Sequence, residues 1–291
     1  MAPPRFQKLV IYGVGLLGGS LGMALRRRGM AGEIVGLGRS QERLERARLL
    51  GAIDRGVTRP AEALDGADAV VLAVPPRQIR ERLGEIAPLL APGTFLTDVG
   101  SVKARIVEEA HRVLPPGVRY IGSHPMAGSE KAGVEYSRGD FYEGCACILT
   151  PDKRTDPQLV SVASAFWRAL GSRIIVMDPG RHDRLLAGIS HLPHLLASAL
   201  MQTLSRSEDV TAEEVAAIAG GGLKDMTRIA AADPEIWRQI FSENSAAVID
   251  WLDALEQVIA QWRAALEKSD SKAISNLFAE GSEARRKLSD E

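Results

Sequence analysis

The segment Lys8-Leu-Val-Ile-Tyr-Gly-Val-Gly-Leu-Leu-Gly18 joins a run of apolar residues to a glycine-rich turn. Residues 8–12 have the pattern of a buried β-strand, and residues 21–28 have the pattern of a helix that Gly29 ends. Residues 33–37 then read as a second strand. A GxGxxG turn between a strand and a helix, with a second strand after it, indicates a dinucleotide-binding unit.

Each glycine of the turn has a distinct physical role. We expect Gly13 to make the tight turn, Gly15 to let the backbone approach a pyrophosphate, and Gly18 to allow close packing of helix on strand. The free N–H groups at the start of the helix, from Leu16 and Leu17, would bind the phosphates. A glycine-rich turn without a ligand is the alternative.

The end of the second strand predicts which cofactor is used. An NAD site usually has a carboxylate about 20 residues past the motif, where it bonds the ribose 2′-OH. Gly38-Arg39-Ser40 stands at this place instead. A guanidinium and a hydroxyl both suit a 2′-phosphate, so NADP is favoured and NAD stays possible. Alternatively, Arg39 only begins the next helix.

Strands and helices go on alternating as far as the middle of the chain. Strand patterns at 69–74, 94–98 and 118–121 predict a doubly wound, mostly parallel sheet with ligands at the carboxyl ends of its strands. Val74 and Pro75 follow one such end and could contact the nicotinamide. The polar candidates at the later ends are Asp98, Ser101, Lys103, His124 and Glu130.

The segment Gly122-Ser-His-Pro-Met-Ala-Gly-Ser-Glu130 carries the candidate acid/base group. We expect a short strand at 118–121 and then a fixed turn that holds His124 at the sheet edge. A turn or packing histidine is the alternative for His124. Its place beside the other polar strand ends favours a site.

The second half of the chain contributes further polar residues. Residues 185–205 contain no Asp, Glu, Lys or Arg, and we interpret them as a core helix that Pro193 kinks. His191 and His194 lie on its small-residue face and fit a pocket wall, although two core histidines or, less favoured, a zinc site are alternatives. Gly220–Gly222 reads as a loop, followed by Asp225 and Arg228 on one helical face, where a surface ion pair is the alternative to a site.

Five motifs together resemble one known family. The glycine turn is joined by Asp98-Val-Gly-Ser-Val-Lys103, Ser123-His-Pro-Met-Ala-Gly-Ser-Glu130, Ser190-His-Leu-Pro-His194 and Gly220-Gly-Gly-Leu-Lys-Asp-Met-Thr-Arg228. In this order they look like the prephenate/arogenate (cyclohexadienyl) dehydrogenases of tyrosine biosynthesis, and the resemblance runs from Leu9 to about Trp251. It implies oxidative decarboxylation of prephenate, arogenate or both, with hydride transfer to NAD(P)+, giving 4-hydroxyphenylpyruvate or tyrosine and CO2.

The resemblance also assigns roles to residues. His124 would accept the hydrogen bond of the substrate hydroxyl, and Ser101 would orient that hydroxyl or His124. Arg228 would bind the side-chain carboxylate, with Asp225 and Glu130 setting its position and access. His191, His194 and Gly221 would complete the substrate site. Retention of Glu130 and both histidines looks more like members that accept prephenate, but the sequence leaves both substrates open.

The composition excludes several other classes of protein. The 291 residues carry 36 Lys+Arg and 37 Asp+Glu, so no net charge argues for nucleic acid or an anionic membrane as partner. The two cysteines, Cys145 and Cys147, are too few for a four-ligand metal site and read as structural thiols of a reducing cytosol. The N-terminus lacks the apolar segment of a secretory signal, so a cytoplasmic protein is expected.

Two domains are expected: residues 1–178, a Rossmann-type dinucleotide-binding domain, and residues 179–291, an all-α domain for substrate binding and dimerisation. Asp233-Pro234 should cap a long helix from Glu235 to about Glu267. The helix has a broad apolar face, part of which we assign to a homodimer interface. That face contains Trp237, Ile240, Phe241, Val248, Trp251, Leu252, Leu255, Ile259 and Trp262. A separate regulatory domain or a fused mutase is not expected.

Two other functions remain open on the sequence. The first is a dehydrogenase of β-hydroxy-acid type, in which Lys103 or Lys224 is the catalytic group. The second is a dinucleotide-binding sensor without catalysis, which would bind the cofactor but never reduce it.

Overall fold

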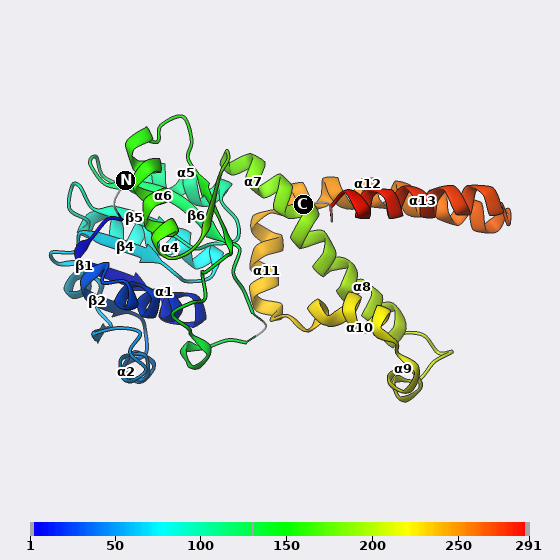
Figure 1. The fold of residues 1–291 in the computed structure, drawn as a ribbon, viewed down its shortest axis with the longest axis horizontal. Coiled ribbons are helices and arrows are strands. Elements are labelled where there is room, and N and C mark those ends of the chain that lie inside the picture. The colour runs from blue at the N-terminus through cyan, green and yellow to red at the C-terminus, as the bar shows by residue number, and fades with distance from the viewer. Residues whose placement is uncertain (1–2, 130, 289–291) are drawn as a thin grey trace. The chain divides into compact units, whose positions relative to one another are not determined.

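The computed structural model describes residues 3–129 and 131–288, and the chain divides into two compact units, Met1–Ser245 and Ala246–Glu291. The first unit contains a single eight-stranded sheet with helices on both faces (Figure 1). Its strands are β1 (Phe6–Tyr12), β2 (Ala31–Leu37), β3 (Arg55–Val57), β4 (Ala69–Leu72), β5 (Phe95–Asp98), β6 (Arg119–Pro125), β7 (Ala146–Thr150) and β8 (Arg173–Val176). The predicted Rossmann-type doubly wound sheet is confirmed.

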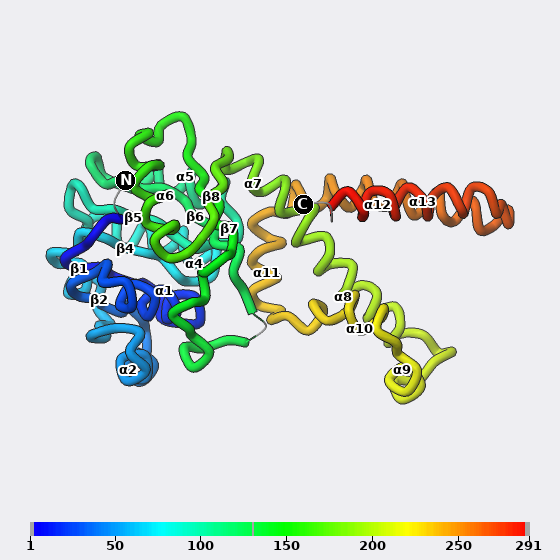
Figure 2. The backbone as a smooth tube through the Cα atoms, viewed as in Figure 1, coloured from blue at the N-terminus to red at the C-terminus, as the bar shows by residue number. Residues whose placement is uncertain are grey.

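The order of the strands is β3-β2-β1-β4-β5-β6-β7-β8. Strands β1 to β6 pair in parallel, β7 runs antiparallel to β6, and β8 is parallel to β7. Figure 2 traces the backbone through β6, β7 and β8, which lie side by side. The strand order reverses between β1 and β4, and a crevice for a ligand opens at such a switch point. The glycine turn after β1 and the Val74-Pro75 segment after β4 therefore lie on either side of the crevice.

Helices cover both faces of the sheet. The helices are α1 (Leu16–Arg27), α2 (Gln41–Leu49), α3 (Pro60–Leu64), α4 (Pro76–Ile86), α5 (Ala104–Val113), α6 (Pro157–Ala169), α7 (Pro179–Leu186), α8 (Leu192–Ser205), α9 (Ala212–Ile218), α10 (Gly221–Thr227) and α11 (Pro234–Glu243). Successive strand residues point to opposite faces. In β1, Leu9 and Ile11 pack with α1, α2 and α6, whereas Val10 and Tyr12 pack with α3, α4, α5 and α11.

The strand that carries His124 is longer than predicted. Residues Gly122–Pro125 pair with Cys147–Thr150 of β7, so β6 extends through Pro125. His124 lies opposite Ile148 within a strand and not in a turn. The expectation of a turn was wrong because the antiparallel partner β7 comes from a distant part of the chain.

The apolar segment 185–205 is not one core helix. It comprises the end of α7, a π-helical turn over Ala187–His191 and then α8, with Pro193 in the first turn of α8. Ile189 is 60% exposed in this chain, and only two α8 residues, Leu192 and Ala197, are buried. The prediction of burial on all sides was therefore wrong. No helix in the described part of the chain is long and apolar enough to cross a membrane.

Two other predicted elements also differ. The helix expected from Glu235 to Glu267 is broken at Asn244, which leaves the helical conformation (φ −124°, ψ 26°) and separates α11 from α12 (Ser245–Glu267). The Gly220–Gly222 segment is not a loop: Gly220 precedes α10, and Gly221 and Gly222 form its first turn. Packing of α10 and α8 against each other offsets the weak helix propensity of these glycines.

The second unit consists mainly of α12 and α13 (Ser271–Lys287). The two helices pack against each other, with the rings of Trp262 and Phe278 edge to face at 6.5 Å. Large apolar side chains nevertheless stay in contact with solvent, among them Ile249, Val258, Ile259 and Leu266. The pairing of α12 with α13 therefore leaves part of the apolar surface of α12 uncovered in this chain.

Candidate active site

The glycine turn fits a dinucleotide. Gly13 has φ +96°, and a Cβ atom there would lie 2.5 Å from the carbonyl oxygen of Ala73. A Cβ at Gly18 would lie 1.9 Å from the carbonyl oxygen of Gly13, so α1 packs too closely on the turn for any side chain. Gly15 has nothing within 4 Å of its Cβ position, which leaves open space beside the start of α1 for a pyrophosphate.

The carboxyl end of β2 lies beside this turn, because Leu37 pairs with Tyr12 of β1. Arg39 follows and is exposed, and no residue in the described chain pairs with its guanidinium. The Ser40 hydroxyl accepts a hydrogen bond from the backbone N–H of Arg43 and caps α2. Val74 packs beside Gly13, and Pro75 precedes α4. These are the surroundings that the sequence predicted for the cofactor.

A buried ion pair organises the end of β5. Asp98 and Lys103 are both 0% exposed, and the Lys103 Nζ atom donates to Asp98 Oδ2. Asp98 also accepts from the Tyr120 hydroxyl at 3.0 Å and from the Gly100 N–H at 2.9 Å. The pair, with these additional hydrogen bonds to Asp98, has a structural role. Removal of one partner would leave a buried charge at a cost of about 3–5 kcal/mol. Ser101, in the same turn, is half-buried, and its hydroxyl bonds to none of the described residues.

His124 is 9% exposed and belongs to a chain of hydrogen-bonded groups. Its Nδ1 atom lies 2.8 Å from Nε2 of His182, and Nδ1 of His182 lies 2.8 Å from Oδ1 of Asp183. The two rings meet edge to face, with centroids 5.1 Å apart. His182 and Asp183 come from α7, so the end of the sheet and the helical segment meet at this histidine.

The charge state of His124 follows from its surroundings. Burial lowers the pKa of His124 well below its usual value of 6.5, and the nearby His182, Lys103 and His191 lower it further. Burial also lowers the pKa of His182, against the opposing effect of Asp183. Both imidazoles are therefore neutral at pH 7. A neutral imidazole can accept a proton from a substrate, as a general base must.

His191 lies in the core and not on an open pocket wall. It is 1% exposed, and its Nδ1 atom lies 3.2 Å from Nδ2 of Asn244. The same Asn244 amide donates to the carbonyl oxygen of Asp183 at 2.8 Å. Burial lowers the pKa of His191 to about 4. This residue therefore ties the π-helical turn before α8 to the break before α12, which differs from the wall position expected from the sequence.

His194 is half-buried and stacks on Trp237, with ring centroids 3.8 Å apart and planes 24° from parallel. Its Nδ1 atom lies 2.9 Å from the carbonyl oxygen of Ser190. Burial is the main cause of its lowered pKa, and the positive charge of Arg228 also contributes. Arg228 is exposed, so its guanidinium can be reached from solvent.

The remaining predicted substrate residues, among the described part of the chain, make fewer contacts with one another. Arg228 begins the turn after α10 instead of continuing that helix, and no ion pair joins it to Asp225 within residues 3–129 and 131–288. The backbone of Arg228 stays helical (φ −51°, ψ −41°), so the expected i, i+3 spacing of Asp225 and Arg228 spans the end of α10. Gly221 and Asp225 are neighbours: a Cβ at Gly221 would lie 4.0 Å from Asp225 Oδ2. Glu130 lies outside the described residues.

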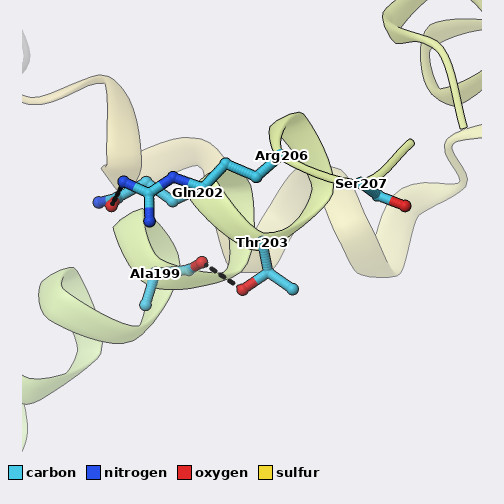
Figure 3. A pocket seen from close by; sticks show the side chains of 5 residues that line it. All are labelled: Ala199, Gln202, Thr203, Arg206 and Ser207. Carbon is cyan, nitrogen blue, oxygen red and sulfur yellow. Dashed lines mark hydrogen bonds between the residues drawn. The ribbon is translucent and has the colours of Figure 1, made fainter. Parts of the chain in front are cut away.

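Two surface hollows lie elsewhere. One of about 560 Å³ is lined by five residues at the end of α8, where Arg206 bonds to Gln202 and Thr203 to the Ala199 carbonyl (Figure 3). The other, of about 300 Å³, lies around residues 110–120 and Arg154. Neither contains a predicted site residue, so neither is the candidate active site.

Sequence reasoning missed three residues of the histidine cluster: His182, Asp183 and Asn244. A signal existed for the first two, because Asp178-Pro179 marks a helix start and a His-Asp pair follows in its first turns. Asn244 stood inside a segment that reads as continuous helix, and only its contacts with Asp183 and His191 explain the break.

Comparison with protein families decides the identity of the whole chain. Residues 21–176 match the nucleotide-binding domain of prephenate dehydrogenase, and residues 178–280 match the dimerization domain of the same enzyme. The chain belongs to the prephenate dehydrogenase family. It is accordingly an oxidoreductase that uses a nicotinamide dinucleotide, which agrees with the geometry around Gly13 and Gly15.

Characterised members of the prephenate dehydrogenase family are similar over nearly the full chain. The prephenate dehydrogenase of Bacillus subtilis is 32% identical over 93% of this chain and 73% of its own length. The cyclohexadienyl dehydrogenase of Zymomonas mobilis is 30% identical over 97% of this chain and 96% of its own.

Solved structures of family members have the same fold. Prephenate dehydrogenase from Aquifex aeolicus, in complex with hydroxyphenyl propionate and NAD+, superposes with a TM-score of 0.89 at 35% identity over 97% of this chain and 98% of its own. Arogenate dehydrogenase from Synechocystis gives 0.83 at 28% identity over 97% of this chain and all of its own.

Proposed function

We propose that this protein oxidatively decarboxylates prephenate, arogenate or both, with hydride transfer to NAD(P)+, in the synthesis of tyrosine. The products would be 4-hydroxyphenylpyruvate or tyrosine, and CO2. The observation that carries the proposal is the neutral, nearly buried His124 at the carboxyl edge of a dinucleotide-binding sheet. A base at this position can deprotonate a hydroxyl group whose carbon gives up a hydride.

The chemistry requires one base and one hydride acceptor. His124 Nε2 would accept the ring-hydroxyl proton while the C–H bond on the same carbon breaks, and a nicotinamide held at the Gly13–Gly18 turn would supply the hydride acceptor. The C–O bond thereby becomes a carbonyl. The bond to the ring carboxylate then breaks, CO2 leaves, and its electron pair passes through the ring to the carbonyl oxygen. This oxygen regains a proton, giving a phenol, and aromatisation drives the reaction.

The other predicted residues would hold the substrate in position. Ser101, whose hydroxyl is without a partner in the described chain, would orient the substrate hydroxyl or His124. Arg228 beside His194 would bind the side-chain carboxylate, a task for which the guanidinium fork is suited. Gly221 and Asp225 would shape the approach to Arg228, and Glu130 would control access. His191 is buried and would stabilise this arrangement through its contact with Asn244.

For the cofactor, we propose a preference for NADP over NAD. The exposed Arg39 guanidinium stands where an NAD-binding carboxylate would be expected, and the Ser40 hydroxyl caps the helix beside it. A 2′-phosphate there would receive charge-assisted hydrogen bonds, which are about twice as strong as neutral ones.

We also propose that the chain forms a homodimer through its helical part, with the domain boundary at residues 178/179. Exposed apolar side chains along residues 185–201 and on α12 support this, because a monomer rarely leaves so many in water. Nicotinamide chemistry would stay with residues 1–178, and residues 179–291 would supply Arg228 and His194. We expect the protein to be cytoplasmic.

The β-hydroxy-acid alternative is weaker than this proposal. Lys103 is 0% exposed and paired with Asp98, so its ammonium is out of reach of a substrate. Lys224 is exposed but has no described acid or base partner to tune it. A sensor without catalysis would not need the neutral histidine pair.

Absorbance of reduced nicotinamide, followed with prephenate and arogenate against NAD+ and NADP+, tests the proposal. We expect turnover with at least one substrate and faster turnover with NADP+. A protein that binds the dinucleotide but reduces none of it with either cyclohexadienol would reject the proposal in favour of the sensor. The same assay with β-hydroxy acids tests the remaining alternative, a dehydrogenase of β-hydroxy-acid type.

A further inference from the structure

The chain of groups His124–His182–Asp183 has only one consistent arrangement of protons. It begins at Asp183, whose carboxylate accepts hydrogen bonds from two backbone groups of another helix. Oδ1 accepts from the N–H of Lys103 at 2.7 Å, and Oδ2 accepts from the N–H of Ala104 at 2.8 Å. Asp183 thus caps the N-terminus of α5, and the helix dipole favours its ionised form.

An ionised carboxylate only accepts hydrogen bonds, and this fixes the next group. The His182 Nδ1 atom, 2.8 Å from Asp183 Oδ1, must carry the proton. In a neutral imidazole the other nitrogen is then an acceptor, so His182 Nε2 presents its lone pair to His124. At the 2.8 Å contact, His124 Nδ1 must be the donor. The lone pair of His124 is left on Nε2.

We propose that His182 and Asp183 are positioning residues that hold His124 in its Nδ1–H tautomer, with Nε2 free to accept the substrate proton. Neither residue touches the substrate in this scheme. The principle resembles a carboxylate that orients a histidine base, but here a second histidine transmits the constraint. The proposal rests on the proposed role of His124 as base and adds the reason why that base is active.

The second histidine also links the base to the fold. Asp183 is anchored to α5, which follows β5 and the Asp98–Lys103 pair, and the carbonyl oxygen of Asp183 accepts from the Asn244 side chain. His182 is 0% exposed, so no water can replace its contact with His124. The tautomer is therefore set by tertiary structure and not by solvent.

Nitrogen-15 NMR of histidine-labelled full-length protein tests the tautomer directly and needs no substrate. The His124 resonances are assigned by their loss in His124→Asn. We expect the proton of His124 on Nδ1 at neutral pH in the unaltered protein. In Asp183→Asn the amide can donate to His182, which reverses both imidazoles, and the proton of His124 should move to Nε2. A proton on Nε2 of His124 in the unaltered protein overturns the proposal.

Kinetics supply the second readout. His182→Gln and Asp183→Asn should each lower kcat by about 10²-fold or more with KM changed less than about 3-fold, because only proton acceptance is impaired. Neither should lower kcat further in a His124→Asn background. His111→Gln is the matched control, since His111 also contacts a carboxylate, Asp152, at 2.8 Å but stands outside the cluster. If His182→Gln and Asp183→Asn both keep the rate of the His111→Gln control, the proposal is overturned.

His182→Gln keeps Asp183 as the cap of α5, so it serves if Asp183→Asn folds poorly. The two readouts also separate this inference from the proposed function. If prephenate and arogenate are both refused but His124 carries its proton on Nδ1, the proposed function fails while the positioning arrangement stands.

Discussion

The Nδ1 atom of His124 lies 2.8 Å from the Nε2 atom of His182, although the two residues are 58 positions apart in the chain. The contact joins the last strand of the parallel part of the sheet to the first helix after β8. It fixes the ring of His124, which we propose as the base, against a helix from the second half of the chain.

The first prediction concerns pH. His124 accepts a proton only when neutral, and burial beside His182, Lys103 and His191 lowers its pKa well below 6.5. The active form therefore persists as the pH falls through 6.5, and kcat/KM should decline only at more acid pH. Initial rates between about pH 8 and pH 5, with circular dichroism as a check on folding, measure this. A decline centred at or above 6.5 would contradict a buried base.

The second prediction concerns the substrate carboxylate. Arg228→Gln removes a charge-assisted hydrogen bond and should raise KM for the cyclohexadienol by about 10- to 100-fold, with a smaller effect on kcat. Lys224→Gln is the control, because Lys224 is also an exposed cation of the same segment. Steady-state kinetics decide the matter, and an unchanged KM in Arg228→Gln excludes the residue from carboxylate binding.

The third prediction concerns cofactor choice. Arg39→Ala should raise KM for NADP+ by about 10-fold or more and leave KM for NAD+ within about 3-fold, since only NADP+ carries a 2′-phosphate. Arg43→Ala, in the first turn of the helix that follows Arg39, removes a neighbouring exposed cation and provides the comparison. Equal losses for the two cofactors would show that Arg39 does not recognise the 2′-phosphate.

The fourth prediction concerns assembly. Ile259 is 49% exposed on the apolar side of α12. Placing a carboxylate there by Ile259→Asp should break a homodimer, because a charge buried in an apolar interface is costly. Gln257→Asp, on the opposite face by helical periodicity, should leave it intact. Light scattering coupled to size-exclusion chromatography reports the mass. A dimer that withstands Ile259→Asp places the interface elsewhere.

The sequence predicted those parts of the fold whose causes are local. The turn from Gly13 to Gly18 carries its own steric reason, since added side chains at Gly13 and Gly18 would overlap backbone atoms. The order of strands and helices followed from the same kind of pattern. The polar residues at the carboxyl ends of β5 and β6 could be located because parallel strands end at one edge of the sheet.

The parts that escaped prediction depend on distant contacts. Gly122–Pro125 joins β6 only because β7 pairs with it, and Asn244 ends α11 while binding Asp183 and His191. His182 and Asp183 have no sequence neighbour that reveals their contact with His124. The exposed Ile189 shows a further limit: an apolar segment predicts burial but does not say which surface buries it.

The most direct test of the account compares the unaltered protein with His124→Asn at saturating substrate and dinucleotide, measuring reduced nicotinamide and released CO2 together. We predict that the unaltered protein forms the two in equal amounts and that His124→Asn lowers kcat by about 10²-fold or more with its fold intact. A His124→Asn variant that forms both products at a near-normal rate would contradict the central claim.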